Sequence, residues 1–444
     1  MDLTRGVSMT ALRSVRFAVV LALALICVSC GDTFRPVAIP VTPNPPDPAA
    51  FHYALILSQN INGATSNPGA SSRVDVSGDT NVAIAKVGLG PVHGVLTPDG
   101  ARVYVANIQE DTVSEYSPSD STTVNTVSLP AGSHPNFVYT TQTDFVYVAN
   151  LGDGASVTPN VAAIATGTNV ATVTIPVGNN PIAMTETPDG KKLYVLNQGG
   201  NSVTAINTSD KSVNATIGLL AAPVWAVARS DNHRVFVLDA SGAITMIDPF
   251  TDGVLGTPAN AGAGANFMFY SQSNNRLYVA NSTAHQVAVY DVSTDALTPL
   301  PTVSLCSTCT VAAITALADG TRAYVVTNQD ADCAAGETAP CTATNVTVIK
   351  TADNSVKTTV AVDPGTSVEV PNVIACDSAR FRRFISAAID GTRVYVSNCD
   401  AGSTAVIRTS DDTHVIDLKA PFGTPSANED VPPPQNPVFI IAGR

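Results

Sequence analysis

Short apolar stretches, whose successive side chains would point to opposite faces of a strand, recur along most of the chain. The clearest reads RVYVAN at 102–107, where Val103 and Val105 point to one side of the chain and Tyr104 and Ala106 to the other. A period of two is that of a β-strand, and this rich content of β-branched and aromatic residues favours a strand buried on both faces. Near copies of the hexapeptide follow at 145–150, 192–197, 234–239, 276–281, 322–328 and 393–398, with a weaker one at 53–60. The pattern predicts one such strand in each of a series of repeated units.

Each unit contains three further strand-like stretches. An apolar run opened by proline, such as 91–96, precedes the motif, and a turn such as Asp99-Gly100 joins the two as in a hairpin. A polar alternating stretch such as 201–210 follows the motif, and then a stretch rich in threonine and valine such as 169–177. Units of about 40 to 50 residues with four short strands are typical of β-propeller blades. The sequence therefore predicts an all-β propeller of four-stranded antiparallel blades.

The repeat also resembles a known family. A proline-led run, a P-D-G turn, Y-V-x-N and then N-S-V-x-x-I-N-T together resemble the repeat of the YVTN-family β-propellers, which belong to bacterial and archaeal cell-surface proteins. The resemblance covers about residues 51–444. It implies a propeller at the cell envelope, but it says little about activity, because propellers carry many unrelated functions.

The number of blades follows from the two ends of the repeat region. The C-terminal stretch 436–443 looks like an inner strand without a following motif strand, and the segment near Tyr53 looks like a blade without its inner strand. Joining the two would close the ring and remove an open sheet edge. This interpretation predicts eight blades, with seven as the alternative if the N-terminal segment only caps the ring.

The first 29 residues look like a processing segment. A basic start is followed by an apolar run at 17–28, which is too short to span a membrane as a helix. Its end resembles a lipobox in which Cys30 would be acylated, although Cys27 stands where leucine is usual. We therefore expect residues 1–29 to be a lipoprotein signal peptide and the protein to be anchored to a membrane by an N-terminal lipid. Gly31 after the cysteine favours the outer membrane or cell surface, and an ordinary cleaved signal peptide is the alternative.

Residues 30–50 form a predicted tether. The segment is rich in proline, which favours extended polyproline geometry. Twenty such residues reach roughly 60 Å at about 3.1 Å each, enough to hold a folded domain at 51–444 away from a membrane.

Charge limits the kinds of partner. The chain carries a net charge of −13, with no basic stripe. An acidic surface disfavours nucleic acid and anionic lipid headgroups as partners. A protein or glycan partner is therefore expected.

Six cysteines lie in the last third of the chain. In an exported protein an even number predicts disulfides, and proximity suggests Cys306–Cys309, Cys333–Cys341 and Cys376–Cys399 among fifteen possible connectivities. A redox role for the C-S-T-C pair is the alternative, although no thioredoxin-like βαβ unit surrounds it.

Polar residues in the predicted inner strands are the candidates for chemistry. His93 and His134 lie near the starts of neighbouring inner strands, and Glu186 lies in the next one. Together they could hold one divalent metal such as Ca²⁺ for lactone or ester hydrolysis in the central channel. No G-x-S-x-G, H-E-x-x-H, P-loop or dinucleotide motif occurs. A binding or scaffold module without a cofactor is therefore the favoured function, and a lactonase-like hydrolase is the alternative.

Overall fold

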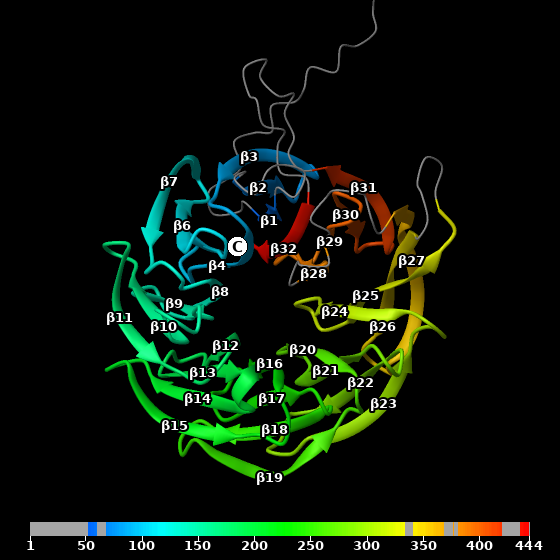
Figure 1. Ribbon diagram of the computed structural model, residues 1–444. Coiled ribbons are helices and arrows are strands. Elements are labelled where there is room, and N and C mark those ends of the chain that lie inside the picture. Colours follow the sequence, from blue (N-terminus) through cyan, green and yellow to red (C-terminus); the bar gives the residue numbers. More distant parts are fainter. Residues whose placement is uncertain are drawn as a thin grey trace, which may run out of the picture. The chain divides into compact units, whose positions relative to one another are not determined.

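The computed structural model describes residues 52–59, 68–333, 341–367, 376, 381–419 and 436–443. The predicted signal peptide, Cys30 and the tether lie outside these residues. The described part forms eight antiparallel sheets of four strands each, arranged as blades around a ring (Figure 1). The predicted β-propeller is therefore confirmed.

The strands of each blade are given from the centre of the ring outward. Blade 1 consists of β32 (Asn436–Ala442), β1 (Tyr53–Gln59), β2 (Ala70–Asp75) and β3 (Thr80–Lys86), and blade 2 of β4 (Pro91–Leu96), β5 (Val103–Asn107), β6 (Thr112–Ser117) and β7 (Asp120–Ser128). Blade 3 consists of β8 (Pro135–Tyr139), β9 (Phe145–Asn150), β10 (Asn160–Ala165) and β11 (Val170–Pro176), and blade 4 of β12 (Pro181–Glu186), β13 (Lys192–Asn197), β14 (Ser202–Asn207) and β15 (Ser212–Gly218). Blade 5 consists of β16 (Pro223–Ala228), β17 (Val235–Asp239), β18 (Ala243–Asp248) and β19 (Gly253–Asn260), and blade 6 of β20 (Ala265–Ser271), β21 (Arg276–Asn281), β22 (Gln286–Asp291) and β23 (Thr298–Ser304). Blade 7 consists of β24 (Thr310–Ala316), β25 (Arg322–Ala331), β26 (Cys341–Lys350) and β27 (Ser355–Ser367), and blade 8 of β28 (Arg383–Ala387), β29 (Arg393–Asn398), β30 (Ser403–Arg408) and β31 (Thr413–Lys419). A short 3-10 helix, η1 (Gln198–Gly200), follows β13.

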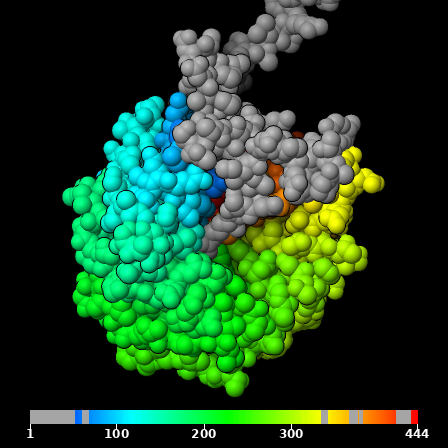
Figure 2. All heavy atoms as spheres, in the orientation of Figure 1, coloured from blue at the N-terminus to red at the C-terminus, as the bar shows by residue number. Residues whose placement is uncertain are grey.

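The two ends of the repeat region share blade 1. Strand β32 pairs antiparallel with β1, with Ile56 opposite Ile440. Residues from near both ends of the chain thus lie in one sheet, and the blades follow one another round the ring in chain order (Figures 1 and 2). The predicted closure is confirmed, and the seven-blade alternative is wrong because the N-terminal segment supplies three full strands to a blade.

The motif strands lie second from the centre of each blade. Residues 103–107 of β5 are all buried, as sheets of neighbouring blades cover both faces of the strand. A strand covered on both faces favours apolar side chains on both of its sides, which explains why the motif lacks an alternation of apolar and polar residues. The outermost strands are mostly exposed, as in β11, and they carry the threonine-rich sequences.

The first residue of the motif, in some blades together with the third, joins a blade to the next one. In blade 4, Lys192 Nζ lies 2.6 Å from Asp252 Oδ2, and the Tyr194 hydroxyl donates to Asp252 Oδ1 at 2.5 Å. Asp252 lies in the turn between the third and fourth strands of blade 5 and has a φ of 54°. Asp and Asn tolerate this left-handed conformation better than most residues do, which explains their place in the turn. We call this contact the inter-blade lock.

Other seams repeat the lock with small changes. Arg322 and Tyr324 both bond to Asp412, and Arg393 bonds to Asp79 at 2.8 Å across the closing seam. At one seam the two partners exchange roles, since Lys211 in the turn lies 3.5 Å above the ring of Phe145. The basic and aromatic motif residues are thus explained by contacts between blades. Among the described residues, such contacts join Arg102 to Asn169, Phe145 to Lys211, Lys192 to Asp252, Arg234 to Asp295, Arg276 to Asn354, Arg322 to Asp412 and Arg393 to Asp79.

Candidate functional site at the centre of the ring

An aromatic cluster occupies the centre of the ring. Its members come from the innermost strands and lie opposite the fifth motif position, as His93 lies opposite Ala106 and Trp225 opposite Leu238. Two blades carry alanine at this position, namely Ala183 and Ala313. The other six blades carry His93, Phe137, Trp225, Phe267, Phe384 and Phe439. We call these six residues, together with Phe381 just before β28, the central aromatic cluster.

The rings of the cluster contact one another directly. Phe137 stacks on His93 with ring centroids 3.7 Å apart, and Phe439 lies 4.3 Å from His93. Phe381 bridges the two sides, since its centroid is 5.9 Å from Trp225 and 5.3 Å from Phe439. Aromatic pairs at such distances contribute about 0.5–1.5 kcal/mol each beyond the area they bury.

The cluster gives the centre of the ring the character of a hydrophobic core. Phe137, Phe267 and Phe439 are buried, while Trp225, Phe381 and Phe384 keep part of their surface accessible. Aromatic side chains in mutual contact fill this layer of the ring in the manner of a packed protein interior. Contacts between these rings join the innermost strands of different blades, and among the described residues this layer offers few polar groups to a substrate.

His93 belongs to this cluster. Its side chain is buried, and its Nδ1 accepts a 3.5 Å hydrogen bond from the backbone N–H of Val138. An imidazole that accepts at Nδ1 and stacks on Phe137 is held in place by its neighbours. His93 thus packs against aromatic neighbours within the cluster.

His134 lies in the connection that leads into β8. Its φ of 49° places it in the left-handed region, and its backbone N–H donates to Asp111 Oδ1 at 2.7 Å. Asp111 Oδ2 also accepts from the N–H of Gly132 at 2.8 Å. These bonds tie blade 2 to blade 3 and account for the position of His134.

Glu186 is the last residue of β12 and is only 1% exposed. Its Oε2 accepts a 2.6 Å hydrogen bond from the backbone N–H of Thr141, while Oε1 is buried without a hydrogen-bond partner. Desolvation by burial outweighs the Thr141 hydrogen bonds and raises the pKa of Glu186 to about 7. Glu186 is therefore a carboxyl group that is easily protonated near neutral pH.

The structure does not bring the three predicted site residues together. Glu186 contacts Thr141, which follows the end of β8, whereas His134 precedes the start of the same strand. Seven residues of extended chain separate those two points, which corresponds to roughly 20 Å. Within the described ranges, no group of three or more His, Cys, Asp or Glu side chains could hold a metal ion.

All three disulfides that proximity suggests are present. They join Cys306 to Cys309, Cys333 to Cys341 and Cys376 to Cys399. The last connects the insertion before β28 to the end of the motif strand β29. In the chain-entropy description, this longest loop contributes about 3.5 kcal/mol to stability, and the short Cys306–Cys309 loop only about 2 kcal/mol.

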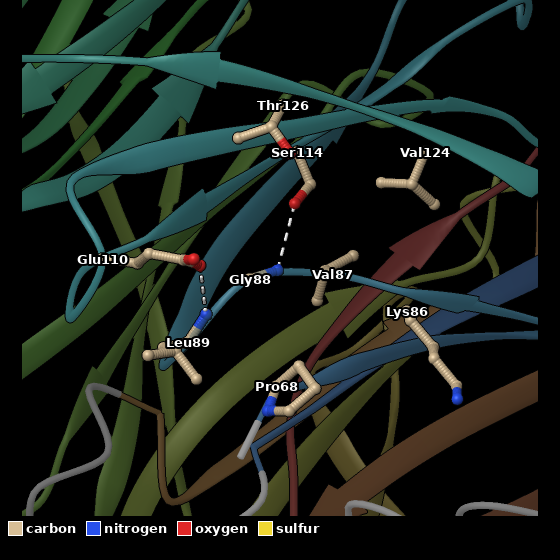
Figure 3. Close-up of a pocket in the computed structure, with 9 residues that line it drawn as sticks. All are labelled: Pro68, Lys86, Val87, Gly88, Leu89, Glu110, Ser114, Val124 and Thr126. Atoms are coloured by element: carbon tan, nitrogen blue, oxygen red, sulfur yellow. Dashed lines mark hydrogen bonds between the residues drawn. The ribbon is translucent and has the colours of Figure 1, made fainter. Parts of the chain in front are cut away.

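A pocket of about 420 Å³ lies at the seam between blades 1 and 2 (Figure 3). On its wall, Glu110 Oε2 accepts from the N–H of Leu89 at 2.9 Å, and Ser114 Oγ accepts from the N–H of Gly88 at 3.1 Å. These two side chains hold the connection between the blades. The lining comprises Pro68, Lys86, Val87, Gly88, Leu89, Glu110, Ser114, Val124 and Thr126.

Comparisons with known proteins add the fold but no activity. Neither a family model nor a curated protein matches the sequence. Among solved structures, the chain is similar to "Dihydro-heme d1 dehydrogenase NirN in complex with DHE", with a TM-score of 0.63 and 12% identity over 88% of this chain and 74% of that one. It is also similar to "Kuenenia stuttgartiensis Hydrazine Synthase", with a TM-score of 0.49 and 15% identity over 74% of this chain and 86% of that one. The first likeness supports the propeller fold alone, and the second, with its lower TM-score, adds nothing to it.

Sequence reasoning missed the central aromatic cluster. The signal was present two residues after the proline that opens several inner strands, as in Phe137 and Trp225. Of the cluster, only His93 was a predicted site residue, because the aromatic side chains at the same position carry no group typical of catalysis.

Among the described residues, no helix has the length and apolar character needed to cross a bilayer.

Proposed function

We propose that this chain is an exported β-propeller of the YVTN type that binds a protein partner at the cell envelope. In this proposal the chain is anchored by a lipid on Cys30, and residues 30–50 hold the ring away from the outer membrane or cell surface. Three disulfides support an oxidising compartment outside the cytosol.

The observation that carries the proposal is the central aromatic cluster. Rings such as Phe137 and Phe267 fill the place where a propeller enzyme would hold its reacting groups. His134 and Glu186 lie at opposite ends of the neighbouring inner strands. The hydrolase alternative therefore has no comparable support, and the outer surface of the ring is left for recognition.

The outer surface favours a protein partner over a glycan. Phe250, in the turn between β18 and β19, is 93% exposed, and Leu220, after β15, is 77% exposed. Exposed valines also occur on the outermost strands β11, β15 and β19. In this proposal these apolar side chains, which suit a protein surface better than a polar glycan, supply the contacts with the partner.

The test is a binding measurement with the full chain and matched surface variants. Envelope proteins of the source cell are fractionated, and binding to the immobilised protein is followed by biolayer interferometry. We expect the variant F250S/L220S to bind its partner at least tenfold more weakly, because it removes the two large apolar side chains that are most exposed in the described ranges. The control T122A, on the outer strand β7, should bind as the unchanged protein does.

Two results would overturn this proposal. One is retention of binding to envelope glycan, with no protein fraction bound, which would favour the glycan alternative. The other is turnover of an ester or lactone that disappears in E186A, which would favour the hydrolase.

A further inference from the structure

The disulfide between Cys306 and Cys309 differs from the other two in its place in the fold. It lies in the connection between β23 and β24, where blade 6 passes to blade 7. Only Ser307 and Thr308 separate the two cysteines, and both are exposed. A bridge within one short connection joins no separate strands, so its contribution to holding the ring together is small.

The two sulfur-bearing residues have different surroundings. Cys309 is 1% exposed, whereas Cys306 is partly exposed. In addition, the backbone N–H of Cys309 donates a 3.0 Å hydrogen bond to Sγ of Cys306. Cys306 is therefore the more open of the two residues to an external thiol, and the same N–H would stabilise a thiolate on Cys306 after reduction.

His285 holds the connection on both sides of the disulfide. Its carbonyl oxygen accepts from the N–H of Leu305 at 3.1 Å, and its ring Nδ1 lies 2.6 Å from the carbonyl oxygen of Cys309. Because a carbonyl oxygen only accepts, Nδ1 is the protonated nitrogen of the ring. The N–H···O bonds of this residue do not involve sulfur, so the connection would keep its shape when the disulfide is opened.

We propose that Cys306–Cys309 is a thiol–disulfide exchange site that oxidises a dithiol on another exported protein. A thiolate of the partner attacks Sγ of Cys306, a mixed disulfide forms, and Cys309 leaves as a thiolate that takes up a proton. The second thiolate of the partner then attacks its own sulfur in the mixed disulfide, and Cys306 leaves as the thiolate that the Cys309 N–H stabilises. The partner loses two electrons and becomes a disulfide, while the propeller gains both electrons and becomes a dithiol.

The first experiment measures the order in which the disulfides of the folded full chain are reduced. The protein is incubated with dithiothreitol at increasing concentration without denaturant, and free thiols are alkylated and counted by peptide mass spectrometry. Cys306 and Cys309 should be labelled at a reductant concentration at least tenfold below that needed for Cys376 and Cys399, with unchanged circular dichroism. Reduction of all three disulfides together, or only on unfolding, would overturn the proposal.

The second experiment separates the roles of the two cysteines. Oxidised glutathione is added to the folded variants C309S and C306S, and the rate of glutathionylation is measured. The accessible Cys306 thiol of C309S should react at least tenfold faster than the buried Cys309 thiol of C306S. Equal rates would overturn the assignment of Cys306 as the attacked residue. Slow reaction of both variants, together with late reduction of the unchanged protein, would identify a structural disulfide.

Discussion

Oε1 of Glu186 is buried without a hydrogen bond, and this residue should therefore make the ring less stable as the pH rises. Burial raises the pKa of Glu186 from its ordinary 4.5 to about 7, because the charged form gains only the Thr141 contacts in exchange for its water. The native state therefore holds a proton that the unfolded state releases above pH 4.5. Stability from this group is present below pH 4.5 and is lost as the pH rises toward 7.

The magnitude follows from the shift. A difference of one pKa unit corresponds to about 1.36 kcal/mol, so the shift from 4.5 to about 7 costs the native state roughly 3 kcal/mol at pH 8. In Glu186→Gln the neutral amide resembles the protonated acid at every pH. We therefore expect the free energy of unfolding of the variant, minus that of the unchanged protein, to grow by roughly 2–3 kcal/mol between pH 5 and pH 8.

The assay is urea unfolding at pH 5, 6, 7 and 8 at constant ionic strength. Trp225 is the single tryptophan of the chain and lies in the central aromatic cluster, so its fluorescence reports loss of the ring. The matched control is Glu115→Gln. Glu115 is 4% exposed, but its carboxylate accepts hydrogen bonds from Asn125 at 2.7 Å and from Asn169 at 2.9 Å, so the control should lose stability at pH 8. A difference for Glu186→Gln that stays constant from pH 5 to 8 would refute the reasoning.

Three further changes probe the inter-blade lock, the aromatic cluster and the ring closure. Asp412→Ala should lower the free energy of unfolding by about 3–5 kcal/mol in urea titrations, because it leaves Arg322 and Tyr324 without their shared acceptor. Asp412→Asn should cost less than half as much, since Asn354 fills the same turn position in blade 7. Equal costs for the two variants would contradict the inter-blade lock. Phe439→Ala should lower the free energy of unfolding by about 3–5 kcal/mol and shift the fluorescence emission of Trp225, and Phe439→Leu is the milder control. Unchanged stability of Phe439→Ala would show that the centre is not a packed core. Removal of residues 436–444 takes the innermost strand from blade 1 and exposes the edge of β1. Analytical ultracentrifugation should then detect association of the chains through this edge. A truncated chain that stays monomeric with unchanged stability would argue against closure by this strand.

The repeat made the fold predictable because each blade must solve the same packing problem. A strand covered on both faces needs a continuous apolar sequence, and RVYVAN and its copies supply one at a regular spacing. The closing strand was also predictable, since 436–443 lacked a following motif. The disulfides followed from proximity in the chain.

The arrangement at the centre was less accessible from the sequence. The predicted convergence of His134 and Glu186 depended on blade spacing, but their positions along the strands decide the outcome. Glu186 ends β12, whereas His134 precedes β8. A lock such as that of Lys192 with Asp252 requires two residues 60 positions apart in different blades, and no local pattern shows which turn faces which motif.

The most direct test of the central claim is photo-cross-linking in living cells at position 250. A photoreactive amino acid replaces Phe250 in the full chain, and the same residue placed at Thr122 serves as the control. If the ring binds a protein through its outer surface, irradiation should give a discrete cross-linked species at position 250 and none at position 122. Absence of any cross-linked protein at position 250, with turnover of a small ester that depends on Glu186, would contradict the account.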